Sequence, residues 1–329
     1  MSDDSTINWR PGASKESLIE RARMLKNIRA FFDARSVLEV ETPLLSHYAT
    51  TDPHLDSLSS RFREQPCYLN TSPEYAMKRL LADNPQAIYQ VCKAFRDDEL
   101  GSQHNPEFTM LEWYRPAYDM LQLMDELAEL IVTVFKDAAF VPVFERLSYQ
   151  QAFENVTGFN PHRVTSEVCY QFAVRNNVEI PQGLTVADDV DDWLDWLLTQ
   201  CVLPAFKKDG FTFLYDYPAS QCALARVENN TDQIAVAKRF ELFFADVELA
   251  NGFFELTDAD EQQQRFQQEN QRRQQAGKKA VPIDENFIAA LAHGLPECAG
   301  VAVGLDRLLM VLSSSENIAQ VLSFSWPQA

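Results

Sequence analysis

The sequence is poor in glycine and contains no long apolar run. Glycine occurs only 10 times in 329 residues, which excludes collagen-like and glycine-rich low-complexity chains. No segment approaches the roughly 20 consecutive apolar residues that a membrane-spanning helix needs. The first residues, Met1–Thr6, are polar and acidic, whereas a signal peptide has a basic start and an apolar centre. We therefore expect a soluble protein of the cytoplasm that has no contact with a membrane.

Several common catalytic and metal-binding patterns are also missing. The six cysteines lie far apart and include no CxxC pair, so we expect reduced thiols rather than a disulfide framework or a zinc site. The five histidines show no metal-ligand spacing, and the sequence contains no Walker A, GxGxxG or Gly-x-Ser-x-Gly motif. Any active site is therefore expected to work by positioning and electrostatics.

Positive charge is scarce. Lysine and arginine total 29 against 48 aspartate and glutamate residues, for a net charge of -19. Binding to nucleic acid depends largely on cations that neutralise phosphates, so this chain is expected to bind polyanions poorly. The best candidate for a local basic face contains Arg272, Arg273, Lys278 and Lys279. A solvated helix face is the alternative interpretation of these residues.

The hydrophobic pattern predicts an α+β fold. Apolar residues recur at helical spacing after Ser14, which we expect to cap the first helix. Helices are expected over 14–32, 74–81, 118–136, 258–275 and from 306 to 312, with a mainly helical stretch from 147 to about 200. Strands are expected over 37–40, 68–70, 88–91, 108–114, 211–215, 239–244 and 299–303. The simplest organisation is a flexible tail, 1–14, and one domain, 15–329, with a helical insertion around 145–235.

Two clusters in the first third of the chain could bind a ligand. Thr71-Ser72-Pro73-Glu74 follows a predicted strand, where an acid can hold a ligand amine; a helix cap is the alternative. Phe95–Glu99, followed by His104–Phe108, supplies one arginine for phosphate, acids for magnesium or ribose, and an aromatic ring for adenine. An exposed acidic hairpin loop is the alternative for this second cluster.

Two further clusters lie in the C-terminal third. In a regular strand Glu248 and Glu255 point to opposite faces, because their separation is odd. A bulge or turn at Asn251-Gly252 would bring them together as magnesium ligands; two unrelated surface acids are the alternative. In the segment 300–307, small residues alternate with valines and precede Arg307. They would let a ligand approach the backbone, although a glycine-punctuated core strand has the same pattern.

Taken in order, these clusters resemble the catalytic domain of the class II aminoacyl-tRNA synthetases, and most closely that of the lysyl-tRNA synthetases. The dimer-forming first motif of that class is similar to 31–45, the second to 95–112 and the third to 304–307. The lysine-specific signature resembles 248–256. The resemblance runs from about residue 15 to residue 324 and is weakest between 145 and 235.

Two departures narrow this resemblance. Lysyl-tRNA synthetases carry an anticodon-binding domain before the first motif, and here we expect none, so tRNA binding is not expected. They also have glycine where this chain has Ala302, whose methyl group should reshape the floor of the amino-acid pocket. Both departures occur in a paralogous family, the elongation factor P β-lysine ligases, which the whole chain resembles. The shared segments are Ser-Pro-Glu-Tyr at 72–75, the run 104–114 and Pro-Ala-Ser-Gln at 218–221.

The resemblance implies a reaction. Members of that family activate (R)-β-lysine with ATP and transfer it to a lysine ε-amino group of elongation factor P, a protein whose shape imitates tRNA. The same resemblance implies that the chain forms an antiparallel sheet flanked by helices and assembles as a homodimer. A truncated lysyl-tRNA synthetase-like enzyme that acylates tRNA is the first alternative. A non-catalytic regulatory paralogue is the second, although such proteins normally lose the acids and arginines that this chain keeps.

The resemblance also implies residue roles. Arg96 and Arg307 should be catalytic by binding the ATP phosphates. The other expected ATP-binding residues are Asp97, Asp98, Asn105, Phe108, Glu248, Leu249 and Gly304, and the expected magnesium ligands are Glu248 and Glu255. The expected pocket for β-lysine or lysine is lined by Ser72, Pro73, Glu74, Tyr114, Asn251, Glu255 and Ala302. Asp98 stands where the family usually has glutamate, so its contact to ATP should be weaker or bridged by water.

Overall fold

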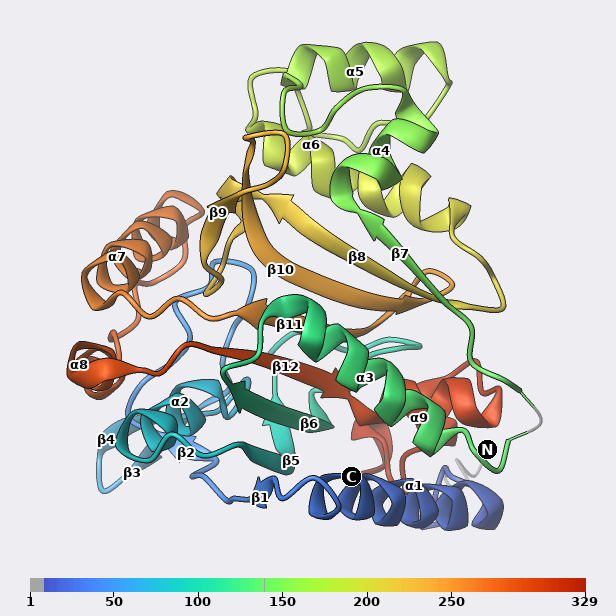
Figure 1. Ribbon diagram of the computed structural model, residues 1–329, viewed down its shortest axis with the longest axis vertical. Helices are drawn as coiled ribbons and strands as arrows, with labels where there is room; N and C mark the ends of the chain where they lie inside the picture. Colours follow the sequence, from blue (N-terminus) through green and yellow to red (C-terminus); the bar gives the residue numbers. More distant parts are fainter. Residues whose placement is uncertain (1–8, 139) are drawn as a thin grey trace, which may run out of the picture.

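A mixed β-sheet runs through the part of the chain that the computed structural model describes, residues 9–138 and 140–329 (Figure 1). The main sheet contains nine strands in the order β1-β5-β6-β12-β11-β10-β8-β7, with β9 paired to β10. β1 is parallel to β5 and β7 is parallel to β8, whereas the other neighbouring pairs are antiparallel. These strands are β1 (Leu38–Glu39), β5 (Ile88–Phe95), β6 (Glu107–Pro116), β7 (Phe144–Ser148), β8 (Phe211–Pro218), β9 (Val227–Asn229), β10 (Ala235–Phe244), β11 (Val247–Phe254) and β12 (Cys298–Gly304). The predicted α+β class, with a mainly antiparallel sheet between helices, is confirmed.

A small second sheet lies beside the first and has the order β2-β4-β3. Its strands are β2 (Leu45–Ser46), β3 (Ser59–Phe62) and β4 (Gln65–Leu69). The predicted strands 37–40 and 68–70 were therefore placed correctly but given wrong bounds. Pro43 contributes no N–H, so the chain cannot continue in the ladder from β1 into β2.

The helices begin where the sequence supplies caps. Ser14 accepts a hydrogen bond from the backbone of Ser17 at the start of α1, and Asp119 forms a capping box with Gln122 at the start of α3. The α-helices of the described chain are α1 (Lys15–Asp33), α2 (Glu74–Asp83), α3 (Met120–Val134), α4 (Tyr149–Thr157), α5 (Ser166–Arg175), α6 (Val190–Leu197), α7 (Ala259–Gln275), α8 (Glu285–Gly294) and α9 (Leu305–Ser313). Each predicted helical segment is confirmed, with ends that differ by a few residues.

Along each strand, alternate side chains point into the core and toward the opposite face of the sheet. Ala299, Val301 and Val303 of β12 lie in the main hydrophobic core with α1, α3 and α9. Gly300 and Ala302, which alternate with them, line a cavity on the other face. The same alternation operates along β6 and β10. The sheet therefore separates a packed core from a ligand-sized cavity.

The predicted insertion around 145–235 contains α4, α5 and α6 and projects from one end of the sheet (Figure 1). It has its own hydrophobic cluster, centred on Tyr149, Phe153 and Trp193, which are completely buried. The cluster continues into Leu214 and Tyr217 of β8. Its boundaries as a separate unit stay a prediction.

The predicted tail, 1–14, falls partly outside the described residues, which begin at Trp9. Within the described part, the backbone N–H groups of Gly12 and Ala13 donate to carbonyls of Ser323 and Leu322. This end of the segment is therefore attached to the C-terminal region. Among the described residues, no helix has the length and apolar character required to cross a bilayer.

Candidate active site

A cavity of 570 Å³ lies on the face of the sheet opposite the main core. Strands β6, β10, β11 and β12 form its floor, and the start of α2, the start of α9 and the segment 43–57 form its walls. It brings together most of the residues predicted from the sequence: Ser72, Pro73, Glu74, Arg96, Asn105, Phe108, Tyr114, Glu248, Leu249, Asn251, Glu255, Ala302, Gly304 and Arg307. A cavity of this size can hold a nucleotide together with a small amino acid.

Asp97 and Asp98 are the two predicted site residues that do not line this cavity. Both are exposed in the loop after β5, and Asp98 has a left-handed backbone with φ 61°. Glu99 lines the cavity instead, with its carboxylate 3.4 Å from Nη1 of Arg96. Contacts of Asp97 and Asp98 with ATP therefore stay a prediction, and Glu99 is the acid adjacent to Arg96.

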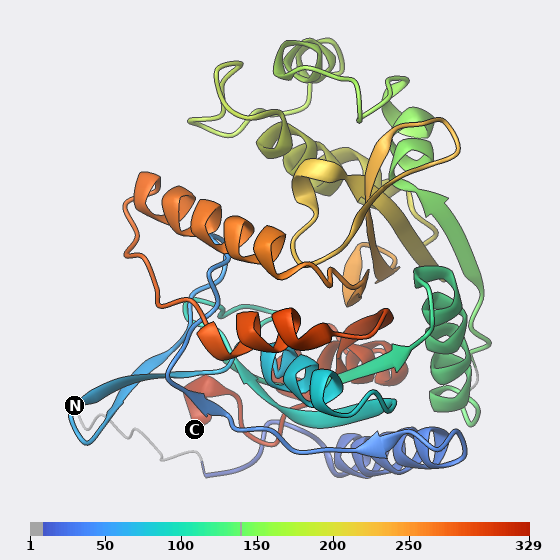
Figure 2. The ribbon, with the colours of Figure 1, turned by 60° about the vertical axis from the view of Figure 1, so that its left-hand side comes forward.

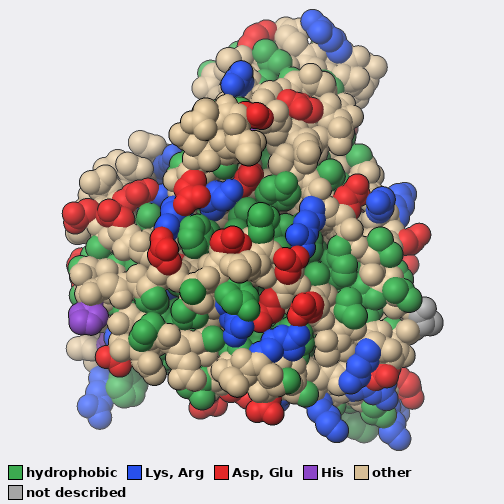
Figure 3. All heavy atoms as spheres, in the orientation of Figure 1, with side chains coloured by type: hydrophobic (Ala, Val, Ile, Leu, Met, Phe, Trp, Pro, Cys, Tyr) green, Lys and Arg blue, Asp and Glu red, His purple; other side chains and the backbone are tan. Residues whose placement is uncertain are grey.

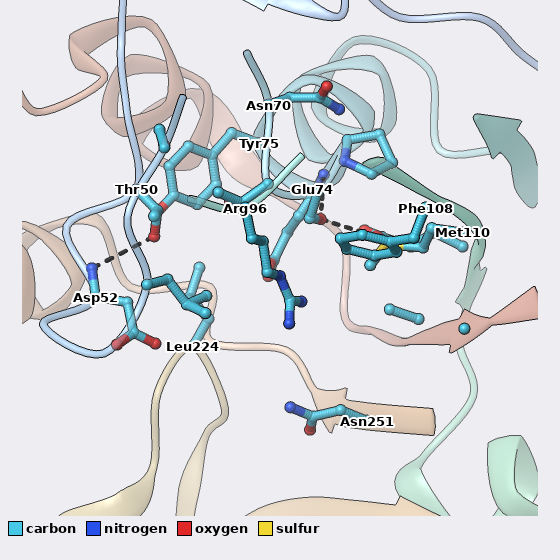
Figure 4. Close-up of a pocket in the computed structure, with 18 of the residues that line it drawn as sticks. Thr50, Asp52, Asn70, Glu74, Tyr75, Arg96, Phe108, Met110, Leu224 and Asn251 are labelled. Carbon is cyan, nitrogen blue, oxygen red and sulfur yellow. Dashed lines mark hydrogen bonds between the residues drawn. The ribbon is translucent and has the colours of Figure 1, made fainter. Parts of the chain in front are cut away.

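Arg96 extends into the cavity between Phe108 and Leu224, with Asn251 on the opposite side (Figure 4). Its guanidinium lies 5.1 Å from the centre of the Phe108 ring, so one face of this ring already has a cationic neighbour. Its Nε is buried and has no hydrogen-bond partner. A buried unpaired donor is costly, and an anionic ligand at this point would satisfy it.

Asn105 lines the cavity, and its side-chain amide is hydrogen-bonded within the protein. Its side-chain nitrogen donates to the carbonyl of Glu107 at 2.6 Å, and its oxygen accepts from the backbone N–H of Trp326 at 2.8 Å. The nitrogen and the oxygen of this side-chain amide therefore both form hydrogen bonds within the protein. In this structure Asn105 attaches the loop between β5 and β6 to the C-terminal region.

Arg307 is held at the start of α9 by backbone and side-chain contacts. Its Nη1 donates to the carbonyl of Glu248 at 2.9 Å, and its Nη2 donates to Nε2 of His104 at 2.6 Å. Burial and the charge of Arg307 lower the pKa of His104 below its ordinary value. A neutral imidazole is consistent with Nε2 acting as the acceptor. Arg307 is therefore a fixed cation in the cavity.

Two carboxylates from neighbouring strands lie beside these arginines. Glu241 of β10 is buried, accepts a hydrogen bond from Tyr217 at 2.7 Å and pairs with Arg239. Glu248 of β11 is 44% exposed in its side chain. Partial burial and the nearby Glu241 raise the pKa of Glu248, while Arg307 opposes this shift. The pair supplies the oxygen donors that magnesium prefers.

The predicted position of the bulge in β11 was wrong. Leu242 of β10 pairs with Ala250 and Phe243 pairs with Glu248, so the extra residue is Leu249 rather than Asn251 or Gly252. After this extra residue, Glu248 and Glu255 face the same cavity despite their odd spacing. They nevertheless belong to different groups, since Glu248 neighbours Arg307 and Glu255 pairs with Lys78. A metal site shared by both carboxylates stays a prediction.

The other end of the cavity is acidic. Glu74 and Glu255 each lie 2.6 Å from Nζ of Lys78. Glu112 is buried and accepts hydrogen bonds from Ser72, at 2.8 Å, and from Tyr114. Burial and the nearby Glu74 raise the pKa of Glu112 to about 8. Burial also raises the pKa of Glu255, although Lys78 opposes the shift. Such a cluster can accept the amino groups of a cationic ligand.

The segment 47–58 covers one side of the cavity and is held by the C-terminal end of α7 (Figure 2). Arg273 donates to the carbonyls of Asp52 and Leu55 and, together with Lys278, pairs with the carboxylate of Asp56. Neither earlier interpretation of this basic region holds for Arg273. Arg273 is only 5% exposed, so it forms neither a nucleic-acid face nor a solvated helix face.

Sequence reasoning missed several residues that line or support the cavity: Lys78, His104, Glu112, Arg239 and Glu241. Period-two alternation was available as a signal for three of them. Glu112 lies between Leu111 and Trp113, and Arg239 and Glu241 flank Phe240, in strands whose apolar residues enter the core. Lys78 gave no comparable signal, because a lysine four residues after a glutamate on a helix is usually a surface ion pair.

Comparison with known proteins gives consistent matches. The family model described as tRNA synthetases class II (D, K and N) matches residues 3–328. The chain is 45% identical over 326 residues to the elongation factor P–(R)-β-lysine ligase of Hamiltonella defensa subsp. Acyrthosiphon pisum (strain 5AT), covering 96% of this chain and 97% of that protein. It is 44% identical over 330 residues to the ligase of the same name from Salmonella paratyphi B (strain ATCC BAA-1250 / SPB7), covering 98% of this chain and 99% of that protein.

Proposed function

Because the chain belongs to the class II (D, K and N) family of tRNA synthetases, we propose that it activates (R)-β-lysine with ATP and joins it to a lysine ε-amino group of elongation factor P. One observation on the site supports this proposal. A single cavity has a cationic end, with Arg96 and Arg307, and an acidic end, with Glu74 and Glu255. The cationic end suits the phosphates of ATP, and the acidic end suits a diamino acid.

The reaction proceeds in two steps. The carboxylate of the amino acid attacks the α-phosphorus of ATP, which forms an aminoacyl-adenylate and releases pyrophosphate. The acceptor amine, once deprotonated, then attacks the carbonyl carbon, which forms an amide and releases AMP. Arg96 and Arg307 stabilise the negative charge on the phosphate oxygens, and the acidic end orients the amino acid. Neither step requires a covalent nucleophile from the enzyme.

Magnesium fits the carboxylates next to the arginines. Glu241 and Glu248 come from paired strands, and both line the cavity. The described residues contain no cluster of three or more acidic, histidine or cysteine side chains arranged around a metal position. A magnesium ion here would therefore take its remaining ligands from phosphates and water, as is usual for this ion. It would supply charge neutralisation on the phosphates.

Ala302 is proposed to favour β-lysine over α-lysine. It lies on the cavity face of β12 between Asn251 of β11 and Glu112 of β6, so its methyl group occupies the floor of the amino-acid pocket. We expect Ala302→Gly to shift the ratio of kcat/KM values toward α-lysine, since one methyl group contributes about 1–3 kcal/mol of discrimination. ATP–pyrophosphate exchange with each amino acid measures this ratio. Unchanged reaction of both would show that Ala302 does not set specificity.

The acceptor is tested by following the labelled amino acid. The protein is incubated with ATP and labelled (R)-β-lysine, and either elongation factor P or tRNA is added. Label on elongation factor P is the expected result, and replacing the acceptor lysine should abolish it. Label on tRNA would favour a truncated tRNA-acylating enzyme, and absence of pyrophosphate exchange would favour a regulatory paralogue. On the face seen in Figure 3, basic side chains are interspersed with acidic ones and form no broad patch.

A homodimer is proposed through α1 and the segment that follows it. This region exposes large apolar side chains on neighbouring elements: Leu18, Ile19, Leu38, Leu44 and Leu45. β1 also forms the edge of the main sheet, and an exposed apolar edge favours association. We expect the protein to sediment at twice the monomer mass and Leu38→Asp/Leu45→Asp to sediment as a monomer. Val174→Asp, on exposed α5, is the matched control; a dimer that survives the double change would contradict this interface.

The reaction partners also favour one location. Elongation factor P acts in translation, so we propose that the enzyme works in the cytoplasm.

A further inference from the structure

The acidic end of the cavity already contains a cation that belongs to the protein. Nζ of Lys78 lies 2.6 Å from Oε1 of Glu74 and 2.6 Å from Oε2 of Glu255. The side chains of Lys78 and Glu255 are each only 1% exposed. Burial disfavours the charge of Lys78, but Glu255 and Glu74 together raise its pKa above the ordinary value. The ammonium group is therefore charged and permanently in place.

Both partners of Lys78 keep binding capacity toward the cavity. Glu74 is 17% exposed in its side chain and lines the cavity. Glu255 also lines the cavity, and its Oε2 is charge-paired with Nζ of Lys78 at 2.6 Å. A ligand amine that reached either carboxylate would join an existing charge-assisted contact.

The charges in the pocket match a ligand with two amino groups. Glu74, Glu112 and Glu255 lie around one ammonium, so full ionisation of the three carboxyls would leave an excess of two negative charges. The two ammonium groups of a diamino acid would balance this excess, and their binding would favour the ionised forms of Glu112 and Glu255, whose pKa values burial raises. Without Lys78 the excess would be three in a buried space, and the carboxylates would take up protons instead.

We propose that Lys78 is a positioning and specificity-determining residue, which orients Glu74 and Glu255 toward the amino groups of the substrate and favours the ionised form of Glu255. This inference rests on the proposed function, because it assigns the pocket to a diamino acid. Lys78 itself touches no reacting atom. It acts through the two carboxylates that it holds.

Each element around Lys78 contributes to its electrostatic environment. α2 contributes Glu74, the end of β11 contributes Glu255, and β6 contributes Glu112 and Tyr114. β12 contributes the Cys298 thiol, whose pKa is raised by burial and by Glu255. From α8 the ring of Phe287 approaches, with its centre 5.8 Å from Nζ. Among these described neighbours Lys78 is the one cation. Its removal therefore makes the net charge of this group more negative.

The test is the pH dependence of the KM for (R)-β-lysine in ATP–pyrophosphate exchange. In Lys78→Met the pocket loses its cation, so the pKa of Glu255, which burial already raises, rises further and this carboxyl is protonated at neutral pH. An ammonium group binds the ionised form, and affinity must then increase as the pH rises through that pKa. We expect the KM for (R)-β-lysine to increase about tenfold or more at pH 7 and to fall progressively as the pH is raised, with the KM for ATP within about twofold of wild type.

Three further variants separate charge from folding. Lys78→Arg keeps the charge and should retain much of the pH profile. Lys78→Met/Glu255→Gln removes one charge of each sign and restores the excess of two, so its KM should lose the added pH dependence while remaining high. Lys207→Met removes an exposed lysine that pairs with Glu145 at 3.4 Å in the insertion, and it should behave as wild type. Thermal unfolding of each variant reports whether it is folded.

Different results overturn the two proposals separately. If the wild type exchanges normally and the KM of Lys78→Met for (R)-β-lysine is unchanged, or rises with no added pH dependence, Lys78 has only a structural role and the inference is wrong. An equal increase in the KM for ATP would lead to the same conclusion. If the wild type exchanges with neither (R)-β-lysine nor lysine, the proposed function fails, and this inference fails with it.

Discussion

Arg96→Ala is expected to lower the rate of ATP–pyrophosphate exchange by a factor on the order of 10² or more, as the loss of a preorganised charge donor does in other enzymes. Arg96 extends into the cavity from the loop after β5 and has a buried, unpaired Nε. Two other arginines that line the cavity are more constrained: Arg307 donates to the carbonyl of Glu248, and Arg239 pairs with Glu241. Arg96 is thus the cation best placed to follow the charge that develops on the α-phosphate.

The kinetic signature distinguishes this role from simple ATP binding. An interaction that forms mainly in the transition state lowers kcat and kcat/KM together, whereas uniform binding raises only the KM for ATP. We expect the first pattern. Arg61→Ala is the matched control, since Arg61 is 75% exposed in its side chain and pairs with Glu64 at 3.7 Å. Near-normal exchange by Arg96→Ala would contradict the assignment of the nucleotide end.

Much of the fold and most of the cavity lining could be predicted, because both depend on local pattern. Ser14 marked the start of α1 through its short polar side chain, and the apolar period of 118–136 marked α3. The predicted cavity residues lie in motifs that end or begin strands and helices, such as Glu74 at the start of α2 and Arg307 in α9. Their proximity then follows from the sheet order, in which β6, β12 and β11 are neighbours.

What could not be predicted depends on contacts between distant segments. The bulge at Leu249 is a property of the pairing between β10 and β11, and neither strand shows it alone. Arg273 is buried because the segment 47–58 reaches it from about 220 residues away in sequence. Lys78 has the spacing of a surface ion pair, and it is buried because Glu255 and Phe287 close over it. Composition and hydrophobic periodicity carry no information on such contacts between distant segments.

Gly300→Ala is expected to have a comparably large effect at the opposite end of the cavity. A Cβ atom at this position would lie 2.3 Å from Cε1 of Tyr114 and 2.5 Å from Oε1 of Glu255. Tyr114 is 2% exposed and Glu255 1% exposed, so neither can move without disturbing its neighbours. We expect the KM for (R)-β-lysine to rise about 100-fold, since a displacement near 1 Å in a positioned site has effects of that order. The free energy of unfolding should fall by about 1–3 kcal/mol, as for other overpacked sites.

Three measurements make this prediction specific to the amino-acid pocket. The KM for ATP should change little, because Arg96 and Arg307 lie at the other end of the cavity. Gly210→Ala is the matched control: its Cβ would meet its nearest neighbours at 3.5 Å, an ordinary contact. Gly210 directly precedes β8 and is not among the residues that line the cavity. Thermal unfolding shows how much of the loss reflects stability. If Gly300→Ala binds (R)-β-lysine as the wild type does, the amino acid does not occupy the space between Tyr114 and Glu255, and its position within the cavity must be assigned elsewhere.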